Sequence, residues 1–163
     1  MFDERTGTIP GPFVAKREGT TVDWKIEVIP IPFSAMDRSK AFYADQLGFN
    51  VDLDHQITPD FRIIQLTPPG SGCSIVLGNG IVETQPGMLQ GIQVVVDDIA
   101  AARAEIVERG VDASPIWHME GSERVDGPGG PWNSFLTFSD PDGNGWVLQE
   151  RPPAGIGEVG PPQ

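Results

Sequence analysis

The chain of 163 residues carries a formal net charge of −12, and 39% of its residues are hydrophobic. That length suffices for one domain with a proper core, and the single Cys73 excludes an intrachain disulfide. So acidic a chain lacks the clustered Lys and Arg that phosphate backbones require, which excludes a nucleic-acid partner. No apolar run is long enough to cross a membrane and no secretory leader is visible, so we expect a cytoplasmic protein without a membrane partner.

Both ends of the chain differ in composition from its middle. Residues 1–23 are rich in Gly, Pro, Thr and charge and show no hydrophobic period, which predicts a poorly ordered or loosely docked extension. Residues 152–163 contain mainly Pro and Gly and are expected to form a flexible tail. The folded part should therefore lie between these two segments.

A first module is expected over residues 24–82. Its opening strand alternates apolar residues on one face, and its helix is expected to end at Gly48, which can adopt the left-handed conformation that ends many helices. The predicted elements are a strand over 24–33, a helix over 35–47 with Ser34 as its N-cap, and strands over 49–54, 61–67 and 73–78.

A second module is expected over residues 91–151, after a linker that contains Gly and Pro. Asp97 or Asp98 can cap its helix. A long loop inside a compact domain is usually functional or mobile, which draws attention to residues 118–132. The predicted elements are a strand over 91–96, a helix over 99–109, and strands over 111–117, 133–139 and 145–150, with the long loop before the last two strands.

Two segments of the chain repeat each other. Residues 67–76 and 140–149 are each a turn rich in Pro and Gly that enters an apolar strand, at an offset of 73 residues. The helix exits at Gly48 and Gly110 repeat in a similar way. An internal repeat of this kind indicates two similar modules, each of the form strand, helix and three strands, with a site between them.

Five short segments carry a family resemblance: 39–43, 47–49, 96–99, 108–111 and the turn Asp140-Pro-Asp-Gly-Asn144. Their order and spacing resemble the vicinal oxygen chelate (VOC) superfamily, which includes glyoxalase I, bleomycin resistance proteins and extradiol dioxygenases. The resemblance covers residues 24–151 as a single domain. It implies an α+β fold in which two tandem βαβββ modules form a cupped mixed sheet around a small-molecule ligand. Some members complete the cup with a second chain, so a monomer or a homodimer is expected.

Metal-dependent members of this superfamily hold a divalent ion with one His, Glu or Gln from each of four strands. The resemblance carries these positions to Val28, Ser74, Gly91 and Val147. Val and Gly have no donor atom, and a neutral Ser hydroxyl is a poor ligand for a divalent ion. We therefore predict no metal in the usual place and no cofactor, with a divalent metal as the alternative. A register shifted by one residue also gives no convincing ligand set.

In this register the cup is lined by apolar side chains with a few neutral hydrogen-bonding groups, as small-molecule sites commonly are. Trp117 and Trp132 flank the long loop and can close over a planar or cationic ligand, or can simply pin the loop to the core. His118 is the candidate for a catalytic acid or base, unless it is an exposed loop histidine. The predicted ligand-binding residues are Gln65, Gln93, Gln149, Thr137, Phe135, Trp117 and Trp132.

Two functions stay open at this point. One is a metal-free binding protein, similar to the bleomycin-resistance branch, that sequesters a small organic ligand of cationic or aromatic character. The other is a VOC-type lyase, isomerase or dioxygenase with a relocated metal site that includes His118, Gln149 or Glu150, or with metal-free acid–base chemistry. The loss of the four ligand positions favours the first, and the many enzymes of the superfamily favour the second by analogy alone.

Overall fold

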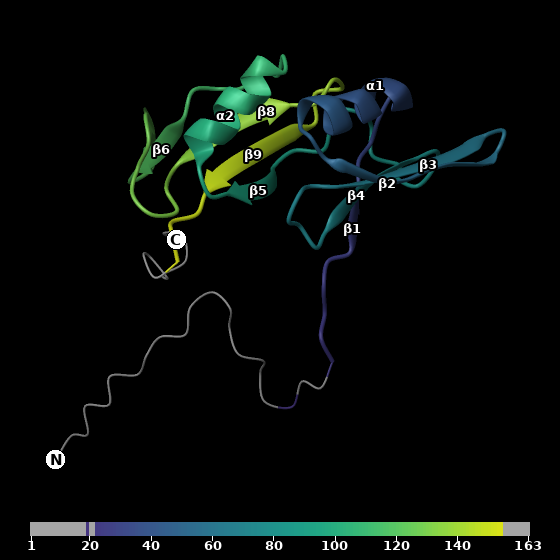
Figure 1. The fold of residues 1–163 in the computed structure, drawn as a ribbon, viewed down its shortest axis with the longest axis horizontal. Helices are drawn as coiled ribbons and strands as arrows, with labels where there is room; N and C mark the ends of the chain where they lie inside the picture. Colours follow the sequence, from purple (N-terminus) through teal and green to yellow (C-terminus); the bar gives the residue numbers. More distant parts are fainter. Residues whose placement is uncertain (1–18, 20–21, 155–163) are drawn as a thin grey trace.

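The computed structural model describes residue 19 and residues 22–154. Most of the extension predicted over 1–23 and of the tail predicted over 152–163 lies outside the described residues. Two mixed sheets lie side by side, and the helices of both modules cover the same side of them (Figure 1). This layering of sheet and helix confirms the predicted α+β fold. None of the described helices has the length and apolar character that a membrane span requires.

Module one forms a four-stranded sheet in the order β1-β4-β3-β2, with β1 parallel to β4. Its helix begins at Met36, one residue after the predicted start, and the prediction of Ser34 as its N-cap is wrong. Ala35 holds that position without a side-chain bond, because the Ser34 hydroxyl donates to Asp142 of the other module instead. The elements are β1 (Val28–Pro30), α1 (Met36–Ala41), its π-helical continuation η1 (Phe42–Gln46), β2 (Asn50–Thr58), β3 (Phe61–Thr67) and β4 (Ser74–Gly78).

Module two forms a five-stranded sheet in the order β5-β9-β8-β6-β7, with β5 parallel to β9. Asp98 caps its helix as predicted, because its carboxylate accepts a 2.9 Å hydrogen bond from the Ala101 N–H. The elements are β5 (Ile92–Val96), α2 (Ile99–Glu108), β6 (Trp117–Glu120), β7 (Glu123–Asp126), β8 (Phe135–Ser139) and β9 (Gly145–Glu150).

The segment between α2 and β8 differs from the prediction. The predicted strand over 111–117 is wrong except at its last residue, and part of the predicted loop over 118–132 is the β6–β7 hairpin. Gly121, at φ 61°, and Ser122 form the two-residue connection of that hairpin. A glycine at the first position of such a connection is a recognised hairpin signal, but the Gly and Pro residues that follow it are typical of a loop.

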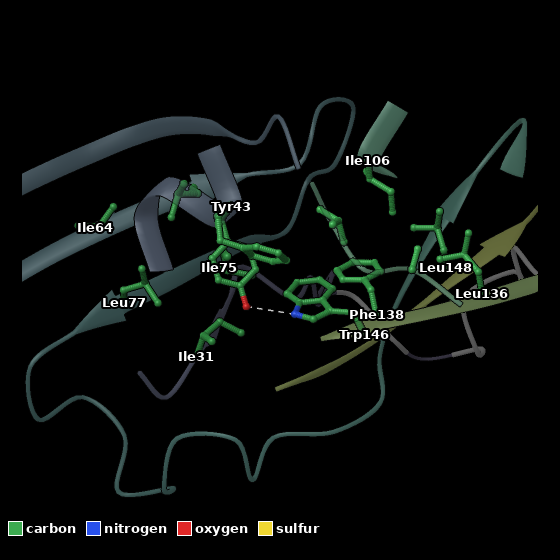
Figure 2. Packing of buried hydrophobic residues seen from close by; sticks show 14 of the residues in the cluster. Ile31, Tyr43, Ile64, Ile75, Leu77, Ile106, Leu136, Phe138, Trp146 and Leu148 are labelled. Atoms are coloured by element: carbon green, nitrogen blue, oxygen red, sulfur yellow. Dashed lines mark hydrogen bonds between the residues drawn. The ribbon is translucent and has the colours of Figure 1, made fainter. Parts of the chain in front are cut away.

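One aromatic cluster joins the two modules into a shared core (Figure 2). The ring of Tyr43 in module one lies 5.6 Å from that of Trp146 on β9, and Trp146 stacks on Phe138 of β8 at 6.1 Å. Trp146 is 1% exposed, which confirms its predicted place in the core. Large aromatic side chains contribute much of the free energy of burial, so the modules are stabilised together rather than singly.

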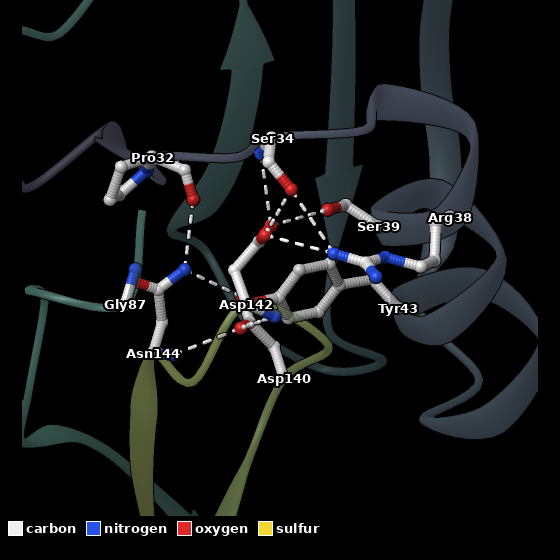
Figure 3. Close-up of polar contacts among 9 residues, drawn as sticks. All are labelled: Pro32, Ser34, Arg38, Ser39, Tyr43, Gly87, Asp140, Asp142 and Asn144. Carbon is white, nitrogen blue, oxygen red and sulfur yellow. Dashed lines mark hydrogen bonds and ion pairs between the residues drawn. The ribbon is translucent and has the colours of Figure 1, made fainter. Parts of the chain in front are cut away.

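Buried polar groups fix the same junction (Figure 3). The carboxylate of Asp140 accepts bonds from the Tyr43 hydroxyl at 2.7 Å, from the backbone N–H groups of Asp142 and Asn144, and from the Asn144 side chain. The Trp146 indole N–H donates to the Tyr43 hydroxyl at 3.1 Å. Burial, and then the charge of Asp140, raise the pKa of Tyr43 well above its usual range.

The turn before β9 also ties down the backbone of module one and the linker. The Asn144 amide donates to the Pro32 carbonyl at 2.8 Å, and its oxygen accepts from the Gly87 N–H at 2.9 Å. Asp142 accepts from Ser34 and from Arg38, the latter at 3.0 Å. The sequence indicated only a turn here, whereas the structure makes it the main polar contact between the modules.

The side of each sheet away from the helices is called the cup face below. Side chains alternate between the two faces of a strand, and the strand register places partners on one side together. On sheet one the cup face carries Val28, Pro30, Leu53, Gln65, Ser74 and Val76, and on sheet two it carries Gln93, Val95, Trp117, Phe135, Thr137, Val147 and Gln149.

Candidate functional site

Six of the seven predicted ligand-binding residues belong to module two. Strand pairing places Gln149, Phe135 and Trp117 side by side in one row across β9, β8 and β6. A second row, next to the first, contains Gln93 and Thr137 on either side of Val147. The sequence periodicity therefore gathered these side chains correctly on one face, and their role in ligand binding stays a prediction.

Two glutamine amides connect the rows. The Gln93 amide donates to the Gln149 oxygen at 2.6 Å, and the Gln149 amide donates to the Trp132 carbonyl at 2.7 Å. Trp132 itself has a φ of 62°, which is uncommon for a residue other than glycine. The chain of hydrogen bonds fixes the backbone at Trp132 against the sheet and orients both amides, which prepares neutral donors and acceptors on the cup face.

The far end of the first row is an aromatic corner, formed by Phe135, Trp117 and Arg124. The rings of Trp117 and Phe135 stack with centroids 4.8 Å apart and planes inclined by 24°. The guanidinium carbon of Arg124, on β7, lies 4.1 Å from the centroid of the Trp117 ring. Cation–π attraction of this geometry holds the guanidinium in place over the ring.

A cavity of about 600 Å³ opens beside these rows at the other end of the sheet. Gly91 and Gly145 form part of its wall; a Cβ at Gly91 would meet open space, whereas the Gln90 side chain fills that place at Gly145. The volume is within the usual range for a small-molecule site. The polar side chains that line it are Gln90, Asp112, Ser114, Thr137 and Ser139.

Gln65 is the predicted ligand contact that lies on module one. It is on β3, between Leu53 and Val76 in the register, so it belongs to the cup face of the other sheet. The structure thus brings five of the predicted side chains together on one face, holds the Trp132 backbone beside them, and leaves Gln65 on the other sheet.

His118 lies on the opposite face of β6 from Trp117, because neighbouring residues of a strand alternate. One ring nitrogen is 2.7 Å from the Gly127 carbonyl oxygen, and the other is 3.0 Å from the Glu120 carboxylate. These two contacts, the carbonyl first, raise the pKa of His118. Both ring nitrogens therefore contact polar atoms of the β6–β7 hairpin and of the segment that follows it.

The geometry of sheets, helices and cup face matches a known family. The family model described as the Glyoxalase/Bleomycin resistance protein/Dioxygenase superfamily matches residues 25–148, about three quarters of the chain. The chain belongs to this superfamily. As a VOC protein it carries two βαβββ modules, with the second extended by strand β7.

Several solved structures share the VOC fold with this chain. TnmS3 from Streptomyces sp. CB03234, described as an antibiotic binding protein, is 30% identical with a TM-score of 0.64, over 81% of this chain and 98% of TnmS3. A superfamily member from Sphaerobacter thermophilus is 30% identical with a TM-score of 0.63, over 79% of this chain and 98% of that one. The uncharacterised protein YetH of Bacillus subtilis is 22% identical over 130 residues, which are 77% of this chain and 98% of YetH.

The metal positions of other VOC proteins carry no fitting donor set here. Val28 and Ser74 are direct neighbours on β1 and β4, and the Ser74 hydroxyl already bonds that of Thr67 at 2.7 Å. In module two, Gly91 and Val147 offer no side-chain donor. The strand register corrects the first of these positions, because Gln93 is the neighbour of Val147 as Val28 is of Ser74, and the Gln93 amide already donates to Gln149. Within residues 22–154, no three side chains of His, Cys, Asp or Glu gather as a ligand set would. That the protein binds no metal remains a prediction.

The relocated metal site of the enzyme alternative needs His118, Gln149 or Glu150 as ligands. Gln149 is on the cup face, whereas His118 is on the opposite face of its strand. Glu150 accepts a 2.9 Å hydrogen bond from the Ile99 N–H at the start of α2, on the helix side. In this arrangement the three side chains do not converge on one point.

Arg124 is the cup-face residue that sequence reasoning missed. It was placed in the predicted long loop, and only the β6–β7 hairpin brings it over Trp117. The alternation of Trp117, Met119, Arg124 and Asp126 across Gly121-Ser122 was the available signal.

Proposed function

We propose that this VOC protein binds a small organic ligand with an aromatic ring on the cup face of module two, without a divalent metal, and sequesters it without converting it. One observation carries the proposal: the superfamily's metal positions offer no carboxylate or imidazole, and they lie beside an aromatic and amide lining that is kept in order by its own stacking and hydrogen bonds. Such a lining recognises a ring by stacking and its substituents by hydrogen bonds.

The likeness to TnmS3 supports a binding role, since that protein is described as an antibiotic binding protein and is 30% identical to this chain. The acidic composition is compatible with a cationic ligand, as the sequence suggested. The aromatic stack favours a planar one.

Exposed apolar side chains on the cup face bear on the oligomeric state. Val28, Leu53 and Val95 are 37%, 43% and 48% exposed in the single chain. They lie on three edge strands, β1, β2 and β5, and a partner that covers the cup face would bury all three, so these residues favour the homodimer among the two expected states. Sedimentation analysis decides this, and a monomer at micromolar concentration that Val95→Asp leaves unchanged would contradict it.

The central test combines binding, turnover and metal content. Purified protein, prepared without chelator, is screened for heat-shift against aromatic compounds, and each hit is titrated by calorimetry and incubated to detect conversion. We expect binding without turnover, about tenfold weaker binding for Gln93→Ala, and no stoichiometric metal. A matched control, Gln56→Ala, removes an exposed glutamine of β2 and should leave the affinity unchanged.

Three results would overturn the proposal. One metal ion per chain that is lost in His118→Ala would instead support the enzyme alternative. Conversion of a bound compound by wild-type protein would exclude simple sequestration. Normal affinity in both Gln93→Ala and Trp132→Ala would remove the ligand from the cup face of module two.

A further inference from the structure

The arginines of this acidic protein differ sharply in what they contact. Among the arginines within residues 22–154, Arg124 is the one whose guanidinium meets neither a carboxylate nor a carbonyl oxygen. Its contact is the face of Trp117, at 4.1 Å. The other five each donate to an oxygen acceptor: Arg38, Arg62, Arg103, Arg109 and Arg151.

The indole ring of Trp117 itself carries a second donor that has no hydrogen-bond partner. The indole Nε1 of Trp117 is the buried side-chain polar atom, within the described part of the chain, that has no hydrogen-bond partner. The indole N–H can only donate, and a buried donor without an acceptor costs about 1 to 3 kcal/mol. Native proteins keep few such groups, so each one calls for an explanation.

The nearby carboxylate does not use these donors. Asp126 lies two residues from Arg124 on the same face of β7, and it is paired in register with Trp117. No ion pair joins Asp126 to Arg124 within the described residues. The guanidinium instead keeps its N–H groups open above the cup face.

We propose that the corner formed by Trp117, Phe135 and Arg124 binds an oxyanion group, such as a carboxylate, carried by the aromatic ligand. This inference rests on the proposed function and adds the charge of the ligand to it. The guanidinium over the face of Trp117 and the unpartnered N–H of the same indole lie at the edge of the row that holds the aromatic lining. The planar guanidinium fork matches a carboxylate with two parallel bonds, and such charge-assisted bonds are about twice as strong as neutral ones.

The corner thereby favours an anionic group on the ligand, whereas the composition of the chain favoured a cationic ligand. A net charge of −12 suggests a cationic ligand, because the field of the whole chain attracts one. Contact chemistry is short-ranged, however, and at this corner the guanidinium of Arg124 and the indole N–H of Trp117 are donors without an acceptor, beside the single carboxylate of Asp126. Arg124, the arginine without an oxygen partner in the described part of the chain, supplies the local attraction that an anion needs.

The test uses three naphthalene probes of the same size and different charge: 2-naphthoate, 2-naphthamide and 2-naphthylmethylammonium. Calorimetry on the full-length wild-type protein measures their dissociation constants at low and at high salt. We expect 2-naphthoate to bind about tenfold more tightly than the amide, the ammonium probe to bind most weakly, and salt to weaken the naphthoate most.

Variants then locate the preference. Arg124→Gln keeps hydrogen-bond donors but removes the charge, so it should reduce naphthoate affinity about tenfold and amide affinity less than threefold. Trp117→Phe keeps a ring without its N–H and should weaken naphthoate by a smaller factor. The matched control is Arg109→Gln, which removes an arginine that pairs with Glu105 at the end of α2. Thermal melting confirms that each variant is folded.

The outcomes separate the inference from the function on which it rests. Equal affinity for all three probes, or naphthoate binding that Arg124→Gln leaves intact, overturns the oxyanion corner and leaves the binding protein standing. Preference for the ammonium probe also overturns it and returns the ligand to a cation. Failure of all three probes to bind overturns both proposals for two-ring aromatic ligands.

Discussion

Two polar clusters of this protein are built from similar groups but differ in whether those groups have hydrogen-bond partners. At the junction of the modules, Tyr43, Trp146, Asn144 and Asp140 exchange hydrogen bonds until each side chain has a partner. At the cup-face corner, Trp117 and Arg124 present donors that meet no acceptor. A tryptophan N–H occurs in both clusters, so the difference is in the surroundings rather than in the residue type.

The comparison distinguishes polar groups that stabilise the fold from polar groups that are available to a ligand. A satisfied buried network holds one arrangement of the chain, because any change leaves a donor or an acceptor unpaired. An unsatisfied donor costs stability and calls for an explanation, and the proposed ligand supplies one by providing the acceptor. Substitutions at the two clusters should therefore separate, with stability lost at the junction and affinity lost at the corner.

The largest effect is expected for Asp140→Ala. The change removes the acceptor of the Tyr43 hydroxyl and of three further donors, so we expect a loss of about 3 kcal/mol in the free energy of unfolding. Denaturant unfolding measures it. The control Asp60→Ala removes an exposed carboxylate from the β2–β3 turn and should change stability by less than about 0.5 kcal/mol. A loss at Asp140 as small as in the control would mean that the junction is not held by this network.

A smaller effect with a distinct pH dependence is expected for Tyr43→Phe. Losing the hydroxyl should cost about 1 to 2 kcal/mol at neutral pH, because the Trp146 N–H loses its acceptor. In the wild type the pKa of Tyr43 is raised above its ordinary value of 10.0, so the folded state holds the proton more tightly than the unfolded state. The stability that the protonated Tyr43 hydroxyl contributes is fully present below pH 10. It falls as the pH rises above 10, by about 1.4 kcal/mol per pH unit.

Unfolding curves of the two proteins across this range measure the difference. The gap between wild type and Tyr43→Phe should stay constant below pH 10 and close above it. Tyr43 is the one tyrosine of the chain, so phenolate absorbance also reports it alone. Ionisation of the folded protein at the ordinary pKa would contradict the buried placement.

The smallest effect on stability is expected for Gly121→Ala, in the hairpin that carries the corner. Gly121 has a φ of 61° and open space where a Cβ would go, so the cost is backbone strain alone, about 1 kcal/mol. Since this turn positions Arg124 against Trp117, naphthoate binding should weaken together with stability. The matched change Gly72→Ala, at a glycine whose added Cβ also meets nothing and whose φ is not positive, should change neither.

The sequence predicted those parts of the fold that local patterns determine. Period-two alternation placed Gln93, Phe135, Thr137 and Gln149 on one face, and the glycine at position 48 ended the first helix where it was expected. The family resemblance predicted the two modules. These features depend on neighbours in the chain, which a pattern can describe.

The remaining features depend on contacts between distant residues. Asp140 meets Tyr43 across 97 positions, and Ser34 meets Asp142 across 108, so neither partner could be read from the local sequence. That contact also explains why Ser34 failed as a helix cap. The Arg124–Trp117 contact spans only a hairpin and was missed because Gly121-Ser122 was included in a loop.

The turn at Asp140 has a counterpart in the other module, and the two have taken different roles. Residues 67–72 read Thr-Pro-Pro-Gly-Ser-Gly where residues 140–145 read Asp-Pro-Asp-Gly-Asn-Gly, and both turns have a glycine at positive φ in the same place, Gly70 and Gly143. The three side chains that bind the neighbouring module at 140, 142 and 144 are Thr, Pro and Ser in the first copy. Thr67 instead bonds Asp52 and Ser74 within its own sheet. The halves of this repeat have thus become complementary rather than equivalent, and neither half could be exchanged for a second copy of the other without losing the bond that joins them.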